Sequence, residues 1–142
     1  AVRIAERAEA GEGAPPGVAR AGEAEAVRAR VRAYVRLLAE LGAPIVAVDG
    51  GEGLRGRLQR VVEEAAPRFP DLLGGLVVGR GGVIDPEAVC ERALRFPGDR
   101  EREVRLALGE LVAYLEFELL NHPRVPEPEQ FLEALETLRA AV

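Results

Sequence analysis

The sequence predicts a helix-rich α/β or α+β domain, in which four to five helices pack against a small sheet. Three observations predict this class. Apolar residues recur with helical spacing along most of the chain. A short apolar run rich in β-branched residues, at about 44–48, stands between a proline and a glycine pair and is typical of a buried strand. Two further apolar runs flank a glycine turn within about 75–85, which is typical of a hairpin.

The chain divides by composition into a short first segment and a longer remainder. Residues 1–23 are almost entirely Ala, Glu, Gly, Arg and Pro, so we expect a flexible segment with a short helix at about 2–10. Residues 24–142 are long enough to bury a core of their own, and we expect them to form a single globular α/β domain.

The first element of this domain is expected to be a helix from about residue 24 to residue 41. Apolar residues recur there at alternating four- and three-residue steps, and Gly42 stands where a helix C-cap belongs. This apolar face consists of Val27, Val31, Tyr34, Leu38 and Leu41. The strand at 44–48 follows and ends at Asp49-Gly50-Gly51.

A second helix and the hairpin come next. Apolar spacing predicts a helix over 57–69, which Pro70 ends. In the hairpin at 75–85, Arg80-Gly81-Gly82 forms the turn. A small sheet with flanking helices resembles the small sensor and adaptor domains of the roadblock, GAF and PAS type, at the level of the fold alone.

Three helices are expected in the last third of the chain. The strongest helix start is Asp85-Pro86-Glu87, because it combines an N-cap acceptor, a proline at the first helical position and an acid in the first turn. That helix is expected to end near Phe96. A longer helix over 100–121, capped by Asp99, and a final helix over 129–140 complete the domain.

Charge and composition restrict the surroundings of the protein. The net charge is -5, and Arg residues are spread among Glu residues, which makes nucleic acid an improbable partner. No apolar run is long enough for a membrane span, and the single cysteine fits a reducing compartment, so we expect a cytoplasmic protein without a membrane partner. Scarce Asn, Gln, Cys and Met, with many Arg and Glu residues, indicate a thermophile.

The residue inventory also excludes several catalytic chemistries. The chain has no Ser and no Lys, which excludes serine nucleophiles, the lysine of phosphate-binding loops and every Schiff base formed by the chain itself. Cys90 and His122 are the only Cys and His residues, too few for a structural zinc site within one chain. Cys90 lies within the helix at 86–96 and is expected to be buried and inert. No cofactor is required by the sequence.

The sharpest candidate binding site is the formal G-x-G-x-x-G pattern of the Gly51–Gly56 loop. Its glycines follow the predicted strand and open the next helix, as in loops that bind the phosphates of a dinucleotide. The candidate binding residues are Gly51, Gly53, Gly56, Arg55 and Arg57. An ordinary glycine-rich turn is the simpler interpretation, because Glu52 adds negative charge and too few strands follow for a complete Rossmann sheet.

The helix at 100–121 carries two further features. Glu110, Tyr114, Glu118 and His122 share one face, where Glu118 and His122 are weak candidates for a metal site and a solvated face is the simpler interpretation. Leu106, Val112, Phe117 and Leu120 widen the apolar surface of the same helix. Such a helix is either enclosed in the core, which we favour, or shared with a second copy or partner protein.

Two classes of function remain. The first is a non-enzymatic regulatory, sensory or protein-interaction domain, dimeric through the helix at 100–121 and able to bind a small ligand. The alternative is a nucleotide- or anion-binding domain that uses the Gly51–Gly56 loop.

Overall fold

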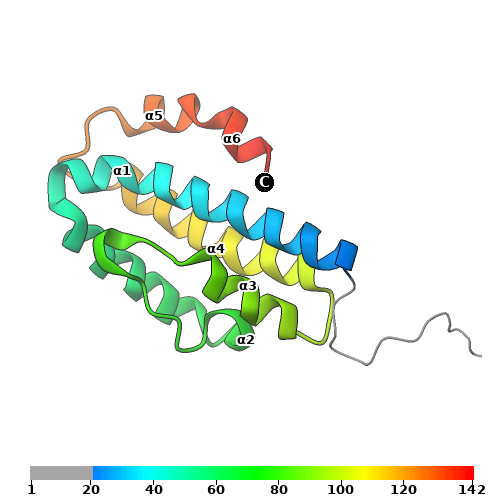
Figure 1. The fold of residues 1–142 in the computed structure, drawn as a ribbon. Helices are drawn as coiled ribbons and strands as arrows, with labels where there is room; N and C mark the ends of the chain where they lie inside the picture. Colours follow the sequence, from blue (N-terminus) through cyan, green and yellow to red (C-terminus); the bar gives the residue numbers. More distant parts are fainter. Residues whose placement is uncertain (1–20) are drawn as a thin grey trace, which may run out of the picture.

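The structure is a computed structural model, and it describes residues 21–142. This part of the chain is all-α, with six α-helices, one short 3-10 turn and no β-strand (Figure 1). The predicted α/β or α+β class is therefore wrong. The likeness to sensor and adaptor domains, which was based on the predicted sheet, is wrong as well. The predicted helix at 2–10 lies outside the described residues, whereas residues 21–23 of the expected flexible segment belong to the first helix.

Helix α1 (Ala21–Ala65) is two helical arms joined at a break. Gly50 has φ 80° and ψ 169°, a conformation that is not helical and that residues with a side chain rarely adopt. The chain reverses at this point, so that the arm at 51–65 returns beneath the arm at 21–49 (Figure 1). Both arms contribute buried residues to the core.

The residues predicted to form a strand at 44–48 lie inside the first arm of α1. The apolar face that begins at Val27 continues beyond Leu41 to the fully buried Ile45, one helical turn further on. Pro44 lacks the N–H that a helical hydrogen bond needs, which lowers the stability of the helix. The helix nevertheless continues through Pro44, because this places Ile45 on the buried face. Gly42 is not a cap: it lies against Leu54 of the second arm, where a Cβ would come within 2.6 Å of a leucine methyl carbon.

The predicted hairpin at 75–85 is reduced to one antiparallel bridge, between Gly79 and Val83, around the short turn η1 (Arg80–Gly82). The backbone groups of the extended residues before the turn form hydrogen bonds with side chains of α1, where a sheet would have a second strand. The side chain of Gln59 accepts from the backbone N–H of Val78 at 2.7 Å and donates to the carbonyl of Leu76 at 3.2 Å. Because a helix satisfies these backbone groups, no sheet forms.

Two helices begin where they were predicted, and a third is matched in part. The second arm of α1 covers most of the helix expected at 57–69. Helix α3 (Pro86–Arg95) begins at Asp85, whose carboxylate accepts from the N–H of Glu87, and helix α4 (Arg100–Leu120) begins at Asp99, which caps in the same way. The short helix α2 (Pro70–Leu73), not predicted, links α1 to the extended segment.

Helix α4 is the centre of the domain. It packs mainly against α1, and the two run side by side through the middle of the molecule (Figure 1). Its buried residues belong to the same core cluster as those of both arms of α1 and include Val104, Leu108, Leu111, Leu115 and Leu119. The core therefore lies on the side of α4 that packs against α1.

The final predicted helix, at 129–140, is two short helices, α5 (Pro128–Ala134) and α6 (Glu136–Ala140), separated at Leu135. They lie along one edge of the bundle (Figure 1), where their apolar side chains are only partly buried. Arg139 holds α6 to α4 through an ion pair with Glu116, in which Nε lies 2.6 Å from the carboxylate. Among residues 21–142, no helix is long and apolar enough to cross a membrane.

Candidate functional site

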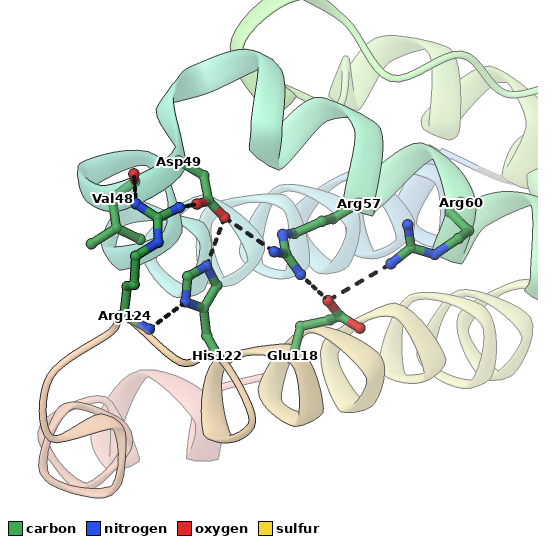
Figure 2. A network of polar contacts seen from close by, with 7 residues as sticks. All are labelled: Val48, Asp49, Arg57, Arg60, Glu118, His122 and Arg124. Atoms are coloured by element: carbon green, nitrogen blue, oxygen red, sulfur yellow. Dashed lines mark hydrogen bonds and ion pairs between the residues drawn. The ribbon is translucent and has the colours of Figure 1, made fainter.

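A network of charged side chains surrounds the break in α1 (Figure 2). At its centre is Asp49, the last residue before Gly50, whose side chain is only 11% exposed. Its carboxylate meets His122 from the end of α4, Arg57 from the second arm of α1, and Arg124 from the loop after α4. One carboxylate thus joins three parts of the chain.

His122 is fully buried and uses both of its ring nitrogens within the protein. Nδ1 accepts the backbone N–H of Arg124 at 3.0 Å, so the ring hydrogen is on Nε2, which donates to Oδ2 of Asp49 at 2.7 Å. An Asp–His pair of this kind orients the base in many catalytic sites. Here neither nitrogen is free to take a proton from a substrate, so the pair is a structural link.

The network extends from Asp49 to α4 through Arg57. Its guanidinium lies 3.2 Å from Oδ2 of Asp49 and donates to Oε1 of Glu118 at 2.5 Å. Arg60, one turn further along the second arm, reaches the same oxygen of Glu118 at 3.8 Å. Arg124 closes the other end, pairing with Asp49 and donating to the carbonyl of Val48 at 2.9 Å.

These contacts lower the pKa of Asp49. The hydrogen bond from His122 is the largest cause, the partial burial of the carboxylate opposes it, and the positive charges of Arg124 and Arg57 add to the lowering. The carboxylate of Asp49 is therefore ionised in the folded protein at neutral pH.

The glycines and arginines of the Gly51–Gly56 loop lie in the first two turns of the second helical arm, and three of these five residues line a common depression. Gly51 packs against the backbone of Gly81, where a Cβ would come within 3.0 Å. Arg55 turns away from the break and donates to the carbonyl of Val78 at 3.2 Å. Gly53, Gly56 and Arg57 line an open depression beside the network.

Glu118 and His122, the weak candidates for a metal site, are committed to protein partners. Their face, predicted to be solvated together with Glu110 and Tyr114, instead meets the second arm of α1 at Arg57 and Arg60 and the turn after it at Arg68, which pairs with Glu110. The expectation of a solvated face is therefore wrong for His122, which is buried. Within the described residues, no cluster of three or more His, Cys, Asp or Glu side chains is placed to hold a metal ion.

Cys90 lies on the buried face of α3. Burial raises the pKa of its thiol, and the negative charge of Glu87 adds to the effect. As a nucleophile requires the thiolate, this environment suits a core residue and not a reactive one.

The outward face of α4 carries the most exposed aromatic side chain of residues 21–142. Phe117 is 60% exposed, and Leu106 and Leu120 on the same face are 41% and 44% exposed. Ala113 and Gly109 lie between them, so we call these five residues the α4 stripe. Val112, predicted to widen the same surface, is buried in the core instead.

Compared with protein-family models, with curated proteins and with solved structures, the chain gives no match. The functional argument therefore rests on the fold and on the two features described above: the network of charged side chains at the break in α1 and the apolar stripe on α4.

Proposed function

We propose that this protein is a non-enzymatic regulatory or interaction domain that associates with a second copy of itself through the α4 stripe. The observation that carries the proposal is the exposure of three large apolar side chains in one row on the central helix. Helical spacing places Leu106, Phe117 and Leu120 on one face, and burial of these side chains is favourable. A contiguous row of this kind marks an interaction surface more often than scattered apolar residues do.

The stripe is self-complementary when two copies of α4 pack in antiparallel directions. With a twofold axis at Ala113, Leu106 of one copy lies opposite Leu120 of the other, because both are seven positions from the axis. Phe117 then lies opposite Gly109, which has open space around its Cβ position. A bulky ring facing a glycine permits close packing of two helices, and a twofold interface uses the same patch on both copies.

The size of the stripe sets the expected strength of association. From Leu106 to Leu120 the helix rises only about 21 Å, so the stripe buries much less than the roughly 800 Å² per partner of a stable complex. We therefore expect a reversible dimer of micromolar or weaker affinity. Such an equilibrium suits a regulatory contact that forms and breaks.

Among residues 21–142, the surroundings of His122, Cys90 and Arg57 agree with a non-enzymatic role. His122 has no free nitrogen, Cys90 is buried, and Arg57 is held between Asp49 and Glu118. We place the domain in the cytoplasm, where a lone cysteine remains reduced.

Sedimentation velocity over micromolar to submillimolar concentrations tests the proposal. The unmodified protein should pass from monomer towards dimer as its concentration rises, and Phe117→Glu should remain monomeric because a charge cannot be buried at an apolar interface without large cost. Val77→Glu is the matched control, since Val77 is 70% exposed on the extended segment, away from α4. It should associate as the unmodified protein does.

A protein that stays monomeric throughout this range contradicts the proposal. So does a dimer that Val77→Glu weakens as much as Phe117→Glu, because association would then depend on general hydrophobicity and not on the α4 stripe.

A further inference from the structure

An open depression of about 590 Å³ lies at the start of the second arm of α1, on the outer side of the Asp49 network. Three arginines line it: Arg57 and Arg60 from the second arm and Arg124 from the loop after α4. Figure 2 shows their guanidiniums arranged along the site, with Asp49 and Glu118 between them. We propose that this depression binds the phosphate group of a small phosphorylated molecule.

The local charge favours an anion. Three guanidiniums face two carboxylates, Asp49 and Glu118, so the cluster keeps one positive charge in excess. Glu52 at the rim does not cancel this charge, because it pairs with Arg55 at 3.3 Å.

The arginines differ in how firmly they are held, and this difference assigns them distinct roles. Arg57 is fixed between two carboxylates, which orients it before any ligand arrives. Arg60 contacts Glu118 only at 3.8 Å and is 56% exposed, so its guanidinium has donors to spare. Arg124 is 61% exposed and lies across the site from Arg60. Guanidiniums of this kind match the paired oxygens of phosphate well.

Gly56 provides independent support. A glycine inside a helix is less favourable than alanine, and a Cβ at Gly56 would meet nothing within 4 Å, so packing gives no reason for it. Gly53, on the same wall, is explained by packing, because its Cβ would come within 2.6 Å of the Cβ of Asp49. The bare backbone at Gly56 leaves the depression open to a ligand.

The depression is larger than one phosphate ion and is open to solvent, so it leaves room for an organic group attached to the phosphate. We therefore place the phosphate of a phosphomonoester at Arg60, whose guanidinium has donors to spare, and its organic group in the remaining space of the depression. Nothing in this site depends on the α4 stripe, and the test can use the Phe117→Glu protein so that association does not interfere.

Isothermal titration calorimetry at low and constant ionic strength, with inorganic phosphate and with phenyl phosphate as probes, tests the assignment. We expect saturable binding of both probes, with phenyl phosphate the tighter. Arg60→Gln should weaken binding by about tenfold or more, because it removes a charge-assisted donor. Gly56→Glu should weaken binding at least as much, because it adds a negative charge beside the phosphate. Gly56→Gln has the same bulk without the charge, so it should weaken binding less.

Arg36→Gln is the matched control, since Arg36 is exposed on the first arm of α1, away from the depression. It should leave both affinities unchanged. Amide chemical shifts measured by NMR should move at Gly53 and Gly56 during the titration, which locates the ligand even if one variant fails to fold.

Three results overturn the assignment. The first is that neither probe binds saturably. The second is that Arg36→Gln loses as much affinity as Arg60→Gln, and the third is that the amide chemical shifts change only at residues outside the depression. Tighter binding of inorganic phosphate than of phenyl phosphate would keep the anion site but reject the organic group.

Discussion

Nε2 of His122 donates to the carboxylate of Asp49 at 2.7 Å, although the two residues are 73 positions apart in the sequence. Asp49 stands at the break in α1, and His122 follows the last turn of α4. The hydrogen bond therefore joins the reversal of the long helix to the end of the central one. Arg57 and Arg124 add ion pairs to the same carboxylate, so this contact fixes the path of the chain at one end of the bundle.

Asp49→Asn should destabilise the protein at neutral pH and have a smaller effect in acid. The pKa of Asp49 is lowered in the folded state, so its contribution is present above the pKa of an unfolded aspartate and is lost as the pH falls through the lower, folded value. Denaturant unfolding of both proteins at neutral pH and at about pH 3 measures the difference.

Asp71→Asn, at an exposed position on α2, is the control for this experiment and should show little effect at either pH. A stability difference between Asp49→Asn and the unmodified protein that stays the same down to about pH 3 would argue against an ionised Asp49 as the stabilising form.

His122→Ala should destabilise the domain by about 2–3 kcal/mol, because it empties a buried site and removes a donor from Asp49. Thermal unfolding followed by circular dichroism measures the loss. A change within about 0.5 kcal/mol, the usual size for surface substitutions, would show that the link between α1 and α4 is dispensable.

Substitution by alanine at two exposed glycines, Gly50 and Gly56, should change the stability of the protein in opposite directions. Neither Cβ would meet another atom within 4 Å, so the difference comes from the backbone alone. Gly50→Ala should cost about 1–3 kcal/mol because φ 80° and ψ 169° is a conformation that only glycine adopts readily. Gly56→Ala should stabilise by about 0.5–1 kcal/mol in the absence of ligand.

Melting temperatures of the two glycine variants, measured side by side, decide this prediction. If Gly50→Ala is as stable as the unmodified protein, α1 does not break at Gly50, and the two-arm description fails.

Cys90 should resist thiol reagents in the folded protein. Its thiol is buried and its pKa is raised, so modification at neutral pH requires opening of the structure. The rate of reaction with a chromogenic disulfide should rise steeply with added denaturant. Fast stoichiometric labelling without denaturant would place Cys90 at the surface.

Helices with strong local signals were predictable from the sequence. Asp85-Pro86-Glu87 gave the start of α3, and Asp99 gave the start of α4, because a cap depends on residues within one turn. The prediction of a strand at 44–48 was wrong because it relied on local composition. This segment has the composition of a strand, yet Ile45 and Val48 continue the four- and three-residue steps of the preceding helix. Giving that spacing more weight than Gly42 and Pro44 would have predicted one helix up to the break at Gly50.

The polar network was largely beyond sequence analysis. Glu118, His122 and Arg57 were singled out, but Asp49, Arg60 and Arg124 were not, since their contacts join residues far apart in the sequence. No local spacing links Asp49 to His122. The α4 stripe was more accessible: helical spacing indicated excess apolar surface at Leu106, Phe117 and Leu120, although it could not show which of these side chains the core would bury.

Oxidative cross-linking of Ala113→Cys tests the central claim most directly. Ala113 is exposed at the proposed twofold axis, and the natural Cys90 is buried, so the new thiol is the accessible one. Two copies packed through the α4 stripe bring these thiols within disulfide distance of each other. Ala113→Cys should form a covalent dimer far faster than Ala39→Cys, which alters another exposed alanine, on the first arm of α1. Equal rates for the two variants, or no dimer from Ala113→Cys, would contradict association through α4.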